Sequence, residues 1–267
     1  MNALATIALA FVVSVIIALV LVKAVEVLSD RLHIDEHVIE GSTKVSTFVL
    51  TAYSFILAFI LAASLANYNF ASESSAREAT ALTTFAHSVV GLPPDVRDVE
   101  QHQGICYARA VIQYEWPAMA RHETSQQTSA ALNGLFEPLI ELKTRPGGST
   151  TDITDVETDL RSIVSERTNR IKASNYKLPS LLWIFIFVGA VINILIMALL
   201  LSRTNFWTRI LLLTTLVFVV TLVISIVSAL ERPFGNSPIR VEPVAMESFL
   251  ATRAEFLRDP SADRPCP

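Results

Sequence analysis

Charged residues are scarce in this chain, and the scarcity is concentrated in four stretches. Asp, Glu, Lys and Arg make up 17% of the 267 residues, whereas soluble domains carry about 25%. Four stretches contain none of them: Ala3–Val22, Val45–Phe70, Leu178–Ser202 and Ile210–Leu230. Each reaches roughly the 20 residues that a helix needs to cross the hydrocarbon core of a bilayer. We therefore predict four transmembrane helices.

The first charge-free stretch has an alternative, because a secretory signal peptide also places an apolar run near the N-terminus. A signal peptide begins with a basic segment and has an apolar core of about 7–15 residues. Only Met1 and Asn2 precede the stretch, and the stretch is longer than such a core. We therefore favour a membrane helix that is retained.

Other scarce features exclude classes of partner and of site. The formal net charge is −4 and no segment is strongly basic, so nucleic acid is not an expected partner. The two cysteines, Cys106 and Cys266, lack metal-ligand spacing. They could pair only if the C-terminal tail returned to the central region, and we expect one buried and one exposed thiol instead.

No enzyme motif is present in the sequence. It lacks a phosphate-binding glycine loop, a dinucleotide fingerprint, a nucleophile elbow and a zinc-protease helix. We therefore expect no catalytic residues and no cofactor. His33, His37 and Glu40 have a spacing that could hold a metal, but Asp35 and Glu36 lie among them. A solvated polar link with no metal is the favoured interpretation.

The region between the second and third stretches is too polar for lipid and has helical periodicity. We predict an all-α membrane protein with a helical bundle outside the membrane inserted between spans two and three. Residues 1–68 hold the first two transmembrane helices, 69–177 form the water-exposed helical domain, 178–231 hold helices three and four, and 232–267 form a partly disordered tail.

Breakers and turn signals predict how the helices connect. Gly41 and Ser42 indicate a turn in a polar link between the first two spans. No breaker follows the second span before Gly91, so we expect it to continue as one helix out of the membrane. A further helix is predicted over 125–142. Another begins near Asp152 and is expected to run past Pro179 into the third span.

The side of the membrane on which the domain lies is predicted from basic residues near the span ends. The short links between spans carry fewer of them than the opposite side, which places the domain in the cytoplasm. The residues counted on the domain side are Arg77, Arg161, Arg167, Arg170, Lys172, Lys177, Arg232 and Arg240.

One face of the second span carries small and hydroxyl side chains at helical spacing. The candidate pore-lining residues on this face are Thr47, Thr51, Ser54, Ala58 and Ala62, with Asn69 extending the face at the interface. Such a stripe serves close helix packing or lines a water-filled path through an oligomer. The absence of acidic and basic residues within the spans argues against a proton-coupled transporter.

The order of motifs resembles a bacterial family of bestrophin-like membrane proteins. The residues that carry the resemblance are Glu78, Ala79, Leu82 and Pro93; Tyr114, Glu115, Trp116, Pro117 and Met119; Arg167, Arg170 and Ile171; Leu178, Pro179, Trp183 and Gly189; and Pro233, Phe234, Gly235, Val241 and Pro243. Glu231 departs from the aspartate expected before the Pro-Phe pair.

The resemblance implies a homo-oligomer in the bacterial plasma membrane, by analogy with bestrophins, which are pentameric anion channels with a helical cytosolic domain. It does not by itself transfer a pore, because no run in the second span matches the bestrophin aromatic gate. For Glu115-Trp116-Pro117 two roles remain open. Trp116 packs a helix end while Glu115 pairs with Arg167 or Arg170, or the cluster contacts a ligand or a neighbouring subunit.

Three functions compete on this basis. The first is an oligomeric channel in the lipid bilayer that conducts a small anion, with the second helices around its pore. The second is a non-conducting membrane protein whose helical domain binds a partner or reports a signal. The third, an enzyme acting on lipid, has no catalytic pair in its favour.

Overall fold

The regular secondary structure is helical in the part of the chain that the computed structural model describes, which is residues 3–32, 36–144, 150–252 and 265–266. No strand occurs within those ranges, as predicted. The chain divides into two compact units. We call Met1–Ala66 with Lys177–Glu231 the membrane unit, and Asn67–Tyr176 with Arg232–Pro267 the helical unit.

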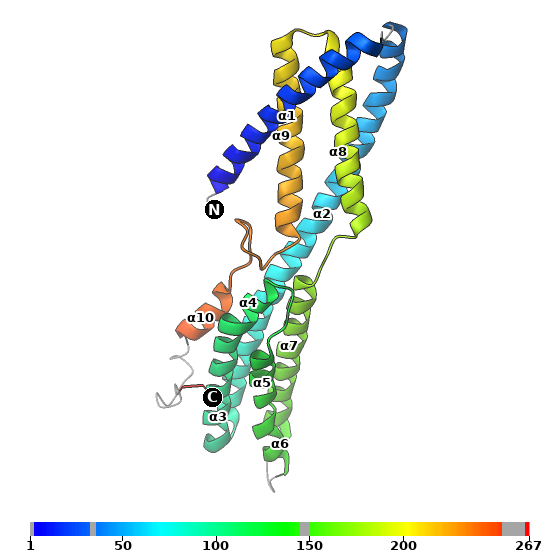
Figure 1. The fold of residues 1–267 in the computed structure, drawn as a ribbon. Coiled ribbons are helices and arrows are strands. Elements are labelled where there is room, and N and C mark those ends of the chain that lie inside the picture. The colour runs from blue at the N-terminus through cyan, green and yellow to red at the C-terminus, as the bar shows by residue number, and fades with distance from the viewer. Residues whose placement is uncertain (1–2, 33–35, 145–149, 253–264, 267) are drawn as a thin grey trace. The chain divides into compact units, whose positions relative to one another are not determined.

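The membrane unit contains long apolar helices (Figure 1). They are α1 (Ala3–Leu32), the first part of α2 (Glu36–Ser88), α8 (Ser180–Leu200) and α9 (Phe206–Leu230), with the short turn η3 (Leu201–Arg203) between the last two. Among the described residues, α2, α8 and α9 are long and apolar enough to cross a membrane. In α1 the described side chains form the shorter apolar segment Ala10–Ala24, so the first predicted span stays a prediction.

Helix α1 packs against α9 within the membrane unit. Ala18 and Val22 are fully buried there, in one cluster with Ala198 and Leu213. In Figure 1, α1 crosses α9 obliquely. The small side chain of Ala18 suits such a crossing, because it lets two helix backbones approach closely.

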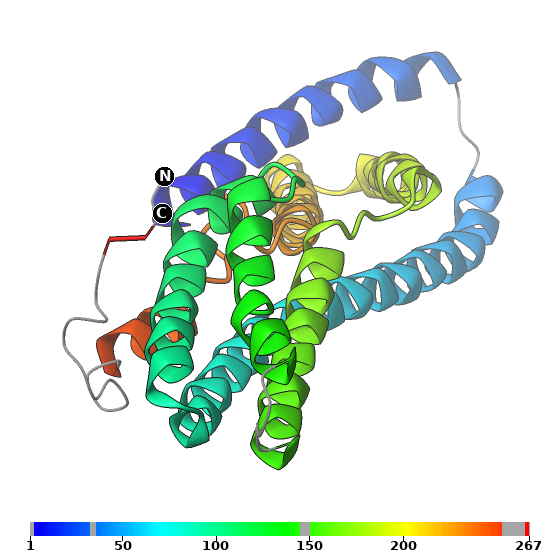
Figure 2. The same ribbon diagram turned by 90° about the horizontal axis from the view of Figure 1, so that it is seen from below.

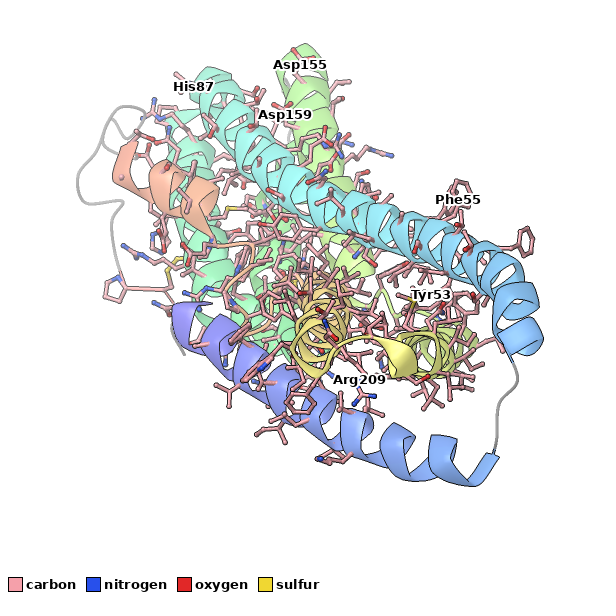
Figure 3. The ribbon with its side chains drawn as sticks, turned by 90° about the horizontal axis from the view of Figure 1, so that it is seen from above. Tyr53, Phe55, His87, Asp155, Asp159 and Arg209 are labelled. Carbon is pink, nitrogen blue, oxygen red and sulfur yellow. A yellow bond between two sulfur atoms is a disulfide. The ribbon has the colours of Figure 1, made fainter. Side chains whose placement is uncertain are left out.

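Helices α2 and α8 meet at a glycine. The hydroxyl of Tyr53 donates a hydrogen bond to the carbonyl of Ile186 at 3.0 Å, and Figure 3 shows Tyr53 pointing toward α8. A Cβ at Gly189 would lie 2.4 Å from Cε2 of Tyr53. Asn193 is buried one turn further on and donates to the carbonyl of Gly189 at 2.7 Å. The missing side chain of Gly189 is therefore what lets the tyrosine ring approach α8 so closely.

The helical unit is built from the second part of α2 and from shorter helices packed beside it (Figure 2). These are η1 (Val89–Gly91), α3 (Pro94–Ala110), the π-helical turn η2 (Val111–Glu115), α4 (Trp116–Met119), α5 (Gln126–Gly134), α6 (Glu137–Thr144), α7 (Thr150–Ser174) and α10 (Val244–Thr252). Leu82 and Phe85 from α2, Leu135 beside α5, and Val156 and Leu160 from α7 are fully buried in one core.

Helix α2 confirms one predicted connection and corrects another. It runs unbroken from the second span to Ser88, as the lack of a breaker predicted. The turn predicted at Gly41 and Ser42 is wrong, because both residues lie inside α2. A single glycine costs a helix only about 1 kcal/mol relative to alanine, which the rest of a long helix readily offsets.

Two other predicted helices are interrupted. Helix α7 ends at Ser174 and α8 begins at Ser180, so the expected continuous helix through Pro179 is wrong. A proline disfavours helical geometry in the residue before it, and Pro179 instead precedes the first turn of α8. The helix predicted over 125–142 is split into α5 and α6 at Leu135 and Phe136.

The cysteine prediction is also wrong, because Cys106 and Cys266 form a disulfide. Helix α10 packs against α3, with Met246 and Phe249 buried in the core of the helical unit. The C-terminal tail therefore returns to the domain, which was the condition for pairing. The disorder predicted for the tail falls on residues 253–264, outside the described residues.

We predict that Gly189→Ala destabilises the membrane unit by about 1–3 kcal/mol, the usual cost of overpacking, because the new methyl group collides with the Tyr53 ring. Thermal unfolding of the detergent-solubilised protein measures the loss. Val188→Ala is the control, since Val188 is exposed. Combining Gly189→Ala with Tyr53→Ala should give a smaller loss than the sum of the two single changes. Additive losses would contradict the proposed contact.

Candidate functional site

The core of the helical unit contains a cluster of buried charged groups. We call it the charge cluster. It consists of Glu78 from α2, Tyr107 from α3, Glu115 at the end of η2, and Arg167 and Arg170 from α7. Glu78, Glu115 and Arg170 are fully buried. Two carboxylates and two guanidinium groups balance each other's charge.

Arg170 is the centre of this cluster. Its Nε and Nη2 donate to the two carboxylate oxygens of Glu78 at 2.5 and 2.9 Å. Nη2 also donates to Glu115 at 2.8 Å, and Nη1 lies 3.2 Å from the sulfur of Met119. The ring of Trp116 covers the guanidinium, with its centroid 5.1 Å from Cζ, a distance at which a cation is attracted to an aromatic face.

Arg167 and Tyr107 complete the hydrogen bonds of the two carboxylates. Arg167 donates to both oxygens of Glu115, at 3.2 and 3.1 Å from Nε and at 2.5 Å from Nη2. The hydroxyl of Tyr107 donates to Glu78 at 2.6 Å. The structure thus brings Glu115 to both arginines, where the sequence suggested one or the other.

The cluster favours the charged forms of Arg170 and Glu115 and the neutral form of Tyr107. Burial alone lowers the pKa of Arg170, but the carboxylates of Glu78 and Glu115 outweigh it and hold that pKa above its usual range. Burial alone raises the pKa of Glu115, and hydrogen bonds and charges from Arg167 and Arg170 reverse this and lower it. Burial, followed by the charge of Glu78, raises the pKa of Tyr107. The ion pairs and hydrogen bonds of these groups join α2, α3, η2 and α7.

The Glu-Trp-Pro and Pro-Phe-Gly motifs lie against each other. Nε1 of Trp116 donates to the carbonyl of Val241 at 3.1 Å, and its ring meets the ring of Phe234 edge to face at 5.3 Å. The amide of Val241 donates in turn to the carbonyl of Pro233 at 2.7 Å, and the amide of Gly235 donates to that of Arg232 at 3.0 Å. The segment after α9 is therefore docked on the aromatic side chain that covers Arg170.

The remaining predicted motif residues have local roles. Pro117 lies in the first turn of α4, and its carbonyl accepts a hydrogen bond from Arg121 at 3.1 Å. Glu231, which departs from the expected aspartate, accepts a hydrogen bond from the amide of Leu178 at 2.8 Å. Among the described residues no group of three metal-ligating side chains is found, and the side chains of His33, His37 and Glu40 lie outside the described part.

Glu78 and Tyr107 are cluster members that sequence reasoning did not place in a site. The helical periodicity of α2 could have identified Glu78. Glu78 precedes Leu82, Phe85 and Val89 at spacings of four, three and four, which puts a carboxylate on the apolar face of α2. An acidic residue on such a face needs a buried positive partner.

A second buried acid, Glu100 of α3, differs from the cluster carboxylates in its surroundings. Its side chain is fully buried, and neither carboxylate oxygen has a hydrogen-bond partner among the described residues. Burial raises its pKa to about 8. Glu100 is therefore protonated in the folded protein at neutral pH.

The candidate pore-lining residues of α2 share one exposed face. Thr47, Thr51, Ser54, Ala58, Ala62 and Asn69 are all exposed. The hydroxyls of Thr51 and Ser54 donate to the carbonyls of Thr47 and Leu50 in their own helix, each at 2.8 Å. The buried residues of the same span, Tyr53, Leu57 and Ile60, lie on a different face, so the stripe does not take part in packing α2 within its own chain.

The chain is similar to known proteins in sequence and in fold. The family model of the Bestrophin-like domain matches residues 12–246. No curated protein matches the sequence. A bacterial bestrophin homologue from Klebsiella pneumoniae carrying a single substitution superposes with a TM-score of 0.76 at 11% identity, covering 95% of this chain and 99% of that one.

Two further solved structures resemble the chain. A Klebsiella pneumoniae bestrophin homologue phased with zinc has a TM-score of 0.74 at 11% identity, over 94% of this chain and 98% of that one. A membrane protein variant has a TM-score of 0.76 at 11% identity, over 95% and 99%. At these identities the likeness concerns the fold.

The fold and its apolar helices define an integral, all-helical membrane protein of the bestrophin type. The chain belongs to the Bestrophin-like domain family.

We predict that Arg170→Ala destabilises the helical unit by about 3–5 kcal/mol, because it leaves Glu78 and Glu115 buried without compensation. Arg170→Lys should also be costly, since one ammonium group does not reproduce the forked contacts of a guanidinium. Arg77→Ala is the control. Arg77 forms exposed ion pairs with Glu73 and Glu166, and such pairs contribute about 0–1 kcal/mol. Equal melting temperatures for the Arg170 and Arg77 variants would contradict the role of the cluster.

We further predict that stability falls with rising pH because of Glu100. In the unfolded chain this carboxyl loses its proton near the ordinary glutamate pKa of 4.5, whereas in the folded protein it keeps the proton until about pH 8. The folded state therefore binds more protons between these values, and stability falls by up to about 1.4 kcal/mol per pH unit across that window and levels off above it. Glu100→Gln should flatten this part of the pH profile of the melting temperature. The exposed Glu137→Gln should leave it unchanged, and a profile that survives Glu100→Gln would assign the effect to other groups.

Proposed function

We propose that the protein is an ion channel formed by several copies of the chain, with α2 of each copy facing a central path for a small anion. The observation that carries this proposal is the exposed face of α2. Its hydroxyl and small side chains turn away from the residues that pack α2 in its own chain. A lipid tail gains nothing from such a face, whereas water, an ion or a second copy does.

The two sides of α2 are visible in Figure 3, where Tyr53 points toward α8 and Phe55 points away from it. Phe48, Phe55 and Phe59 are 74%, 72% and 72% exposed. On a helical wheel their row lies about 80° from the hydroxyl stripe. An apolar aromatic row beside a stripe of hydroxyls suits a helix that has lipid or a neighbouring subunit on one side and the path on the other.

The hydroxyl groups of the stripe and its lack of acidic residues suit an anion better than a cation. Cation channels commonly use rings of acidic side chains, and Val45–Phe70 contains no acidic residue. Ser and Thr hydroxyls have a hydrogen to donate, so rotation of Thr51 or Ser54 would let it bind an anion in place of its helix carbonyl. This chemistry requires no catalytic residue, and the role that we propose is not enzymatic.

The topology that we propose has four spans, of which α1 is the first, and the part Asn67–Tyr176 of the helical unit is inserted between spans two and three. Helix α1 has 30 residues, which at 1.5 Å each gives a length of about 45 Å, more than the hydrocarbon core of a bilayer. The excess of basic residues near the span ends supports a cytoplasmic helical unit in a bacterial plasma membrane.

The alternative is a non-conducting protein whose helical unit binds a partner. A groove of about 1170 Å³ that is bordered by α3 and α5 favours this alternative. Under that alternative, substitutions on this surface would alter function, and substitutions on the α2 stripe would change only stability.

We predict that the purified protein in liposomes conducts chloride, and that Thr51→Leu and Ser54→Leu each reduce the flux, because leucine narrows the path and removes a hydroxyl. Thr215→Leu is the matched control. Thr215 is also exposed, on α9, and donates to the carbonyl four residues earlier in the same way as Thr51. Its replacement should leave the flux unchanged.

Counting subunits by native mass spectrometry tests the assembly in the same preparation. A ring of several copies supports a central path. Folded protein that is monomeric and silent in liposomes would overturn the channel proposal, as would equal flux losses in the Thr51 and Thr215 variants.

A further inference from the structure

The disulfide of the helical unit lies in the wall of a groove with a mixed polar and apolar lining. Helices α3 and α5 pack side by side in Figures 1 and 2, and the groove that they border has a volume of about 1170 Å³. Cys106 on α3 and Cys266 near the C-terminus both line it. The bond therefore sits at the border of a space large enough to admit another molecule.

The two sulfur atoms differ in exposure and in their neighbours. Cys106 is 8% exposed, and Nε2 of His102 lies 3.6 Å from its sulfur. Cys266 is more exposed, and Nη1 of Arg109 donates to its sulfur at 3.6 Å. A positive or hydrogen-bonding neighbour stabilises a thiolate, and thiolates that are so stabilised are better leaving groups. Each sulfur thus has a group beside it that would stabilise it after the bond is broken.

The inference rests on the cytoplasmic placement that we proposed above for the helical unit. Disulfides are rare in a reducing cytoplasm, where those that occur are usually transient and redox-sensing. We propose that Cys106–Cys266 is a thiol–disulfide exchange site for a dithiol reductant, and that exchange switches Cys266 between attachment to α3 and release from it. The proposal concerns only the state of the helical unit and does not require that the protein conducts ions.

The exchange that we propose has two chemical steps. One thiolate of the reductant attacks Sγ of Cys266, the more accessible sulfur. The disulfide breaks, and its electron pair leaves with Sγ of Cys106, beside His102. In the mixed disulfide, the first sulfur of the reductant is bonded to Cys266. The second thiolate of the reductant then attacks that first sulfur and expels the thiolate of Cys266 beside Arg109. The reductant loses two electrons and two protons and becomes a disulfide, and the protein gains both as two thiols.

Reduction of the disulfide changes the wall of the groove. Cys266 belongs to its wall, and only the bond to Cys106 attaches it to α3 covalently. Reduction releases this part of the wall, whereas Gln103, Gln113 and Gln127 from α3, η2 and α5 still line the rest. The groove therefore has an oxidised and a reduced form, which differ in what they expose along α3.

The test uses the full chain in detergent micelles, titrated with dithiothreitol at neutral pH and then treated with a maleimide polymer that adds mass for each free thiol. We expect two thiols to appear while the melting transition shows that the protein is still folded. Thiols that appear only after denaturation would overturn the proposal, because the bond would then be a permanent structural link.

His102→Gln tests the positioning role of His102, which does not itself exchange. Reduction should become several-fold slower, and its pH profile should change, because the departing thiolate of Cys106 loses the imidazole. His87→Gln is the control, since Figure 3 shows His87 on α2, at the end of that helix. An unchanged rate in His102→Gln would contradict the proposed role. Cys266→Ser leaves Cys106 as a single thiol, whose alkylation rate should fall when His102 is also replaced.

Trapping the thiols of growing cells with acid completes the test. Treatment of the cells with a permeant dithiol or with an oxidant should shift the ratio of bonded to free cysteines. A bond that stays fully formed under both treatments would overturn the exchange proposal.

Discussion

The buried guanidinium of Arg170 is the constraint on which the helical unit depends. A charge without exposure to water is tolerated only where opposite charges and hydrogen bonds replace the solvent. Glu78 and Glu115 meet this need, Tyr107 and Arg167 complete the bonding of the two carboxylates, and α2, α3, η2 and α7 must therefore meet at one point. Trp116 covers the cluster and carries the docked segment around Phe234. Residues far apart in the chain thus share one electrostatic requirement.

Helix α2 is the element common to both units, and its buried residues differ between them. In the membrane unit it buries Tyr53, Leu57 and Ile60, and in the helical unit it buries Glu78 and Phe85. The first set packs through shape, as the fit of Tyr53 on Gly189 shows. The second set adds charge. The hydroxyl stripe belongs to neither set and is exposed on the surface of the single chain.

Sequence reasoning succeeded where a local property decides the structure. Length and lack of charge identified α8, α9 and the span in α2, and the absence of a breaker predicted that α2 continues. It failed where a single local signal competed with its surroundings. Gly41 did not end α2, because one glycine costs little in a long helix, whereas Pro179 did separate α7 from α8, because a proline also restricts the residue before it.

The sequence by itself determined the helical class, the membrane character and the family, since these depend on periodicity, hydropathy and motifs that are read along the chain. It also identified Glu115, Arg167 and Arg170 as possible partners. Only the tertiary structure decided that Glu78 and Tyr107 join them, that the carboxyl of Glu100 is buried apart from them, and that Cys106 reaches Cys266. These facts depend on which residues meet across long separations in the chain, and that is decided by the packing of several helices together.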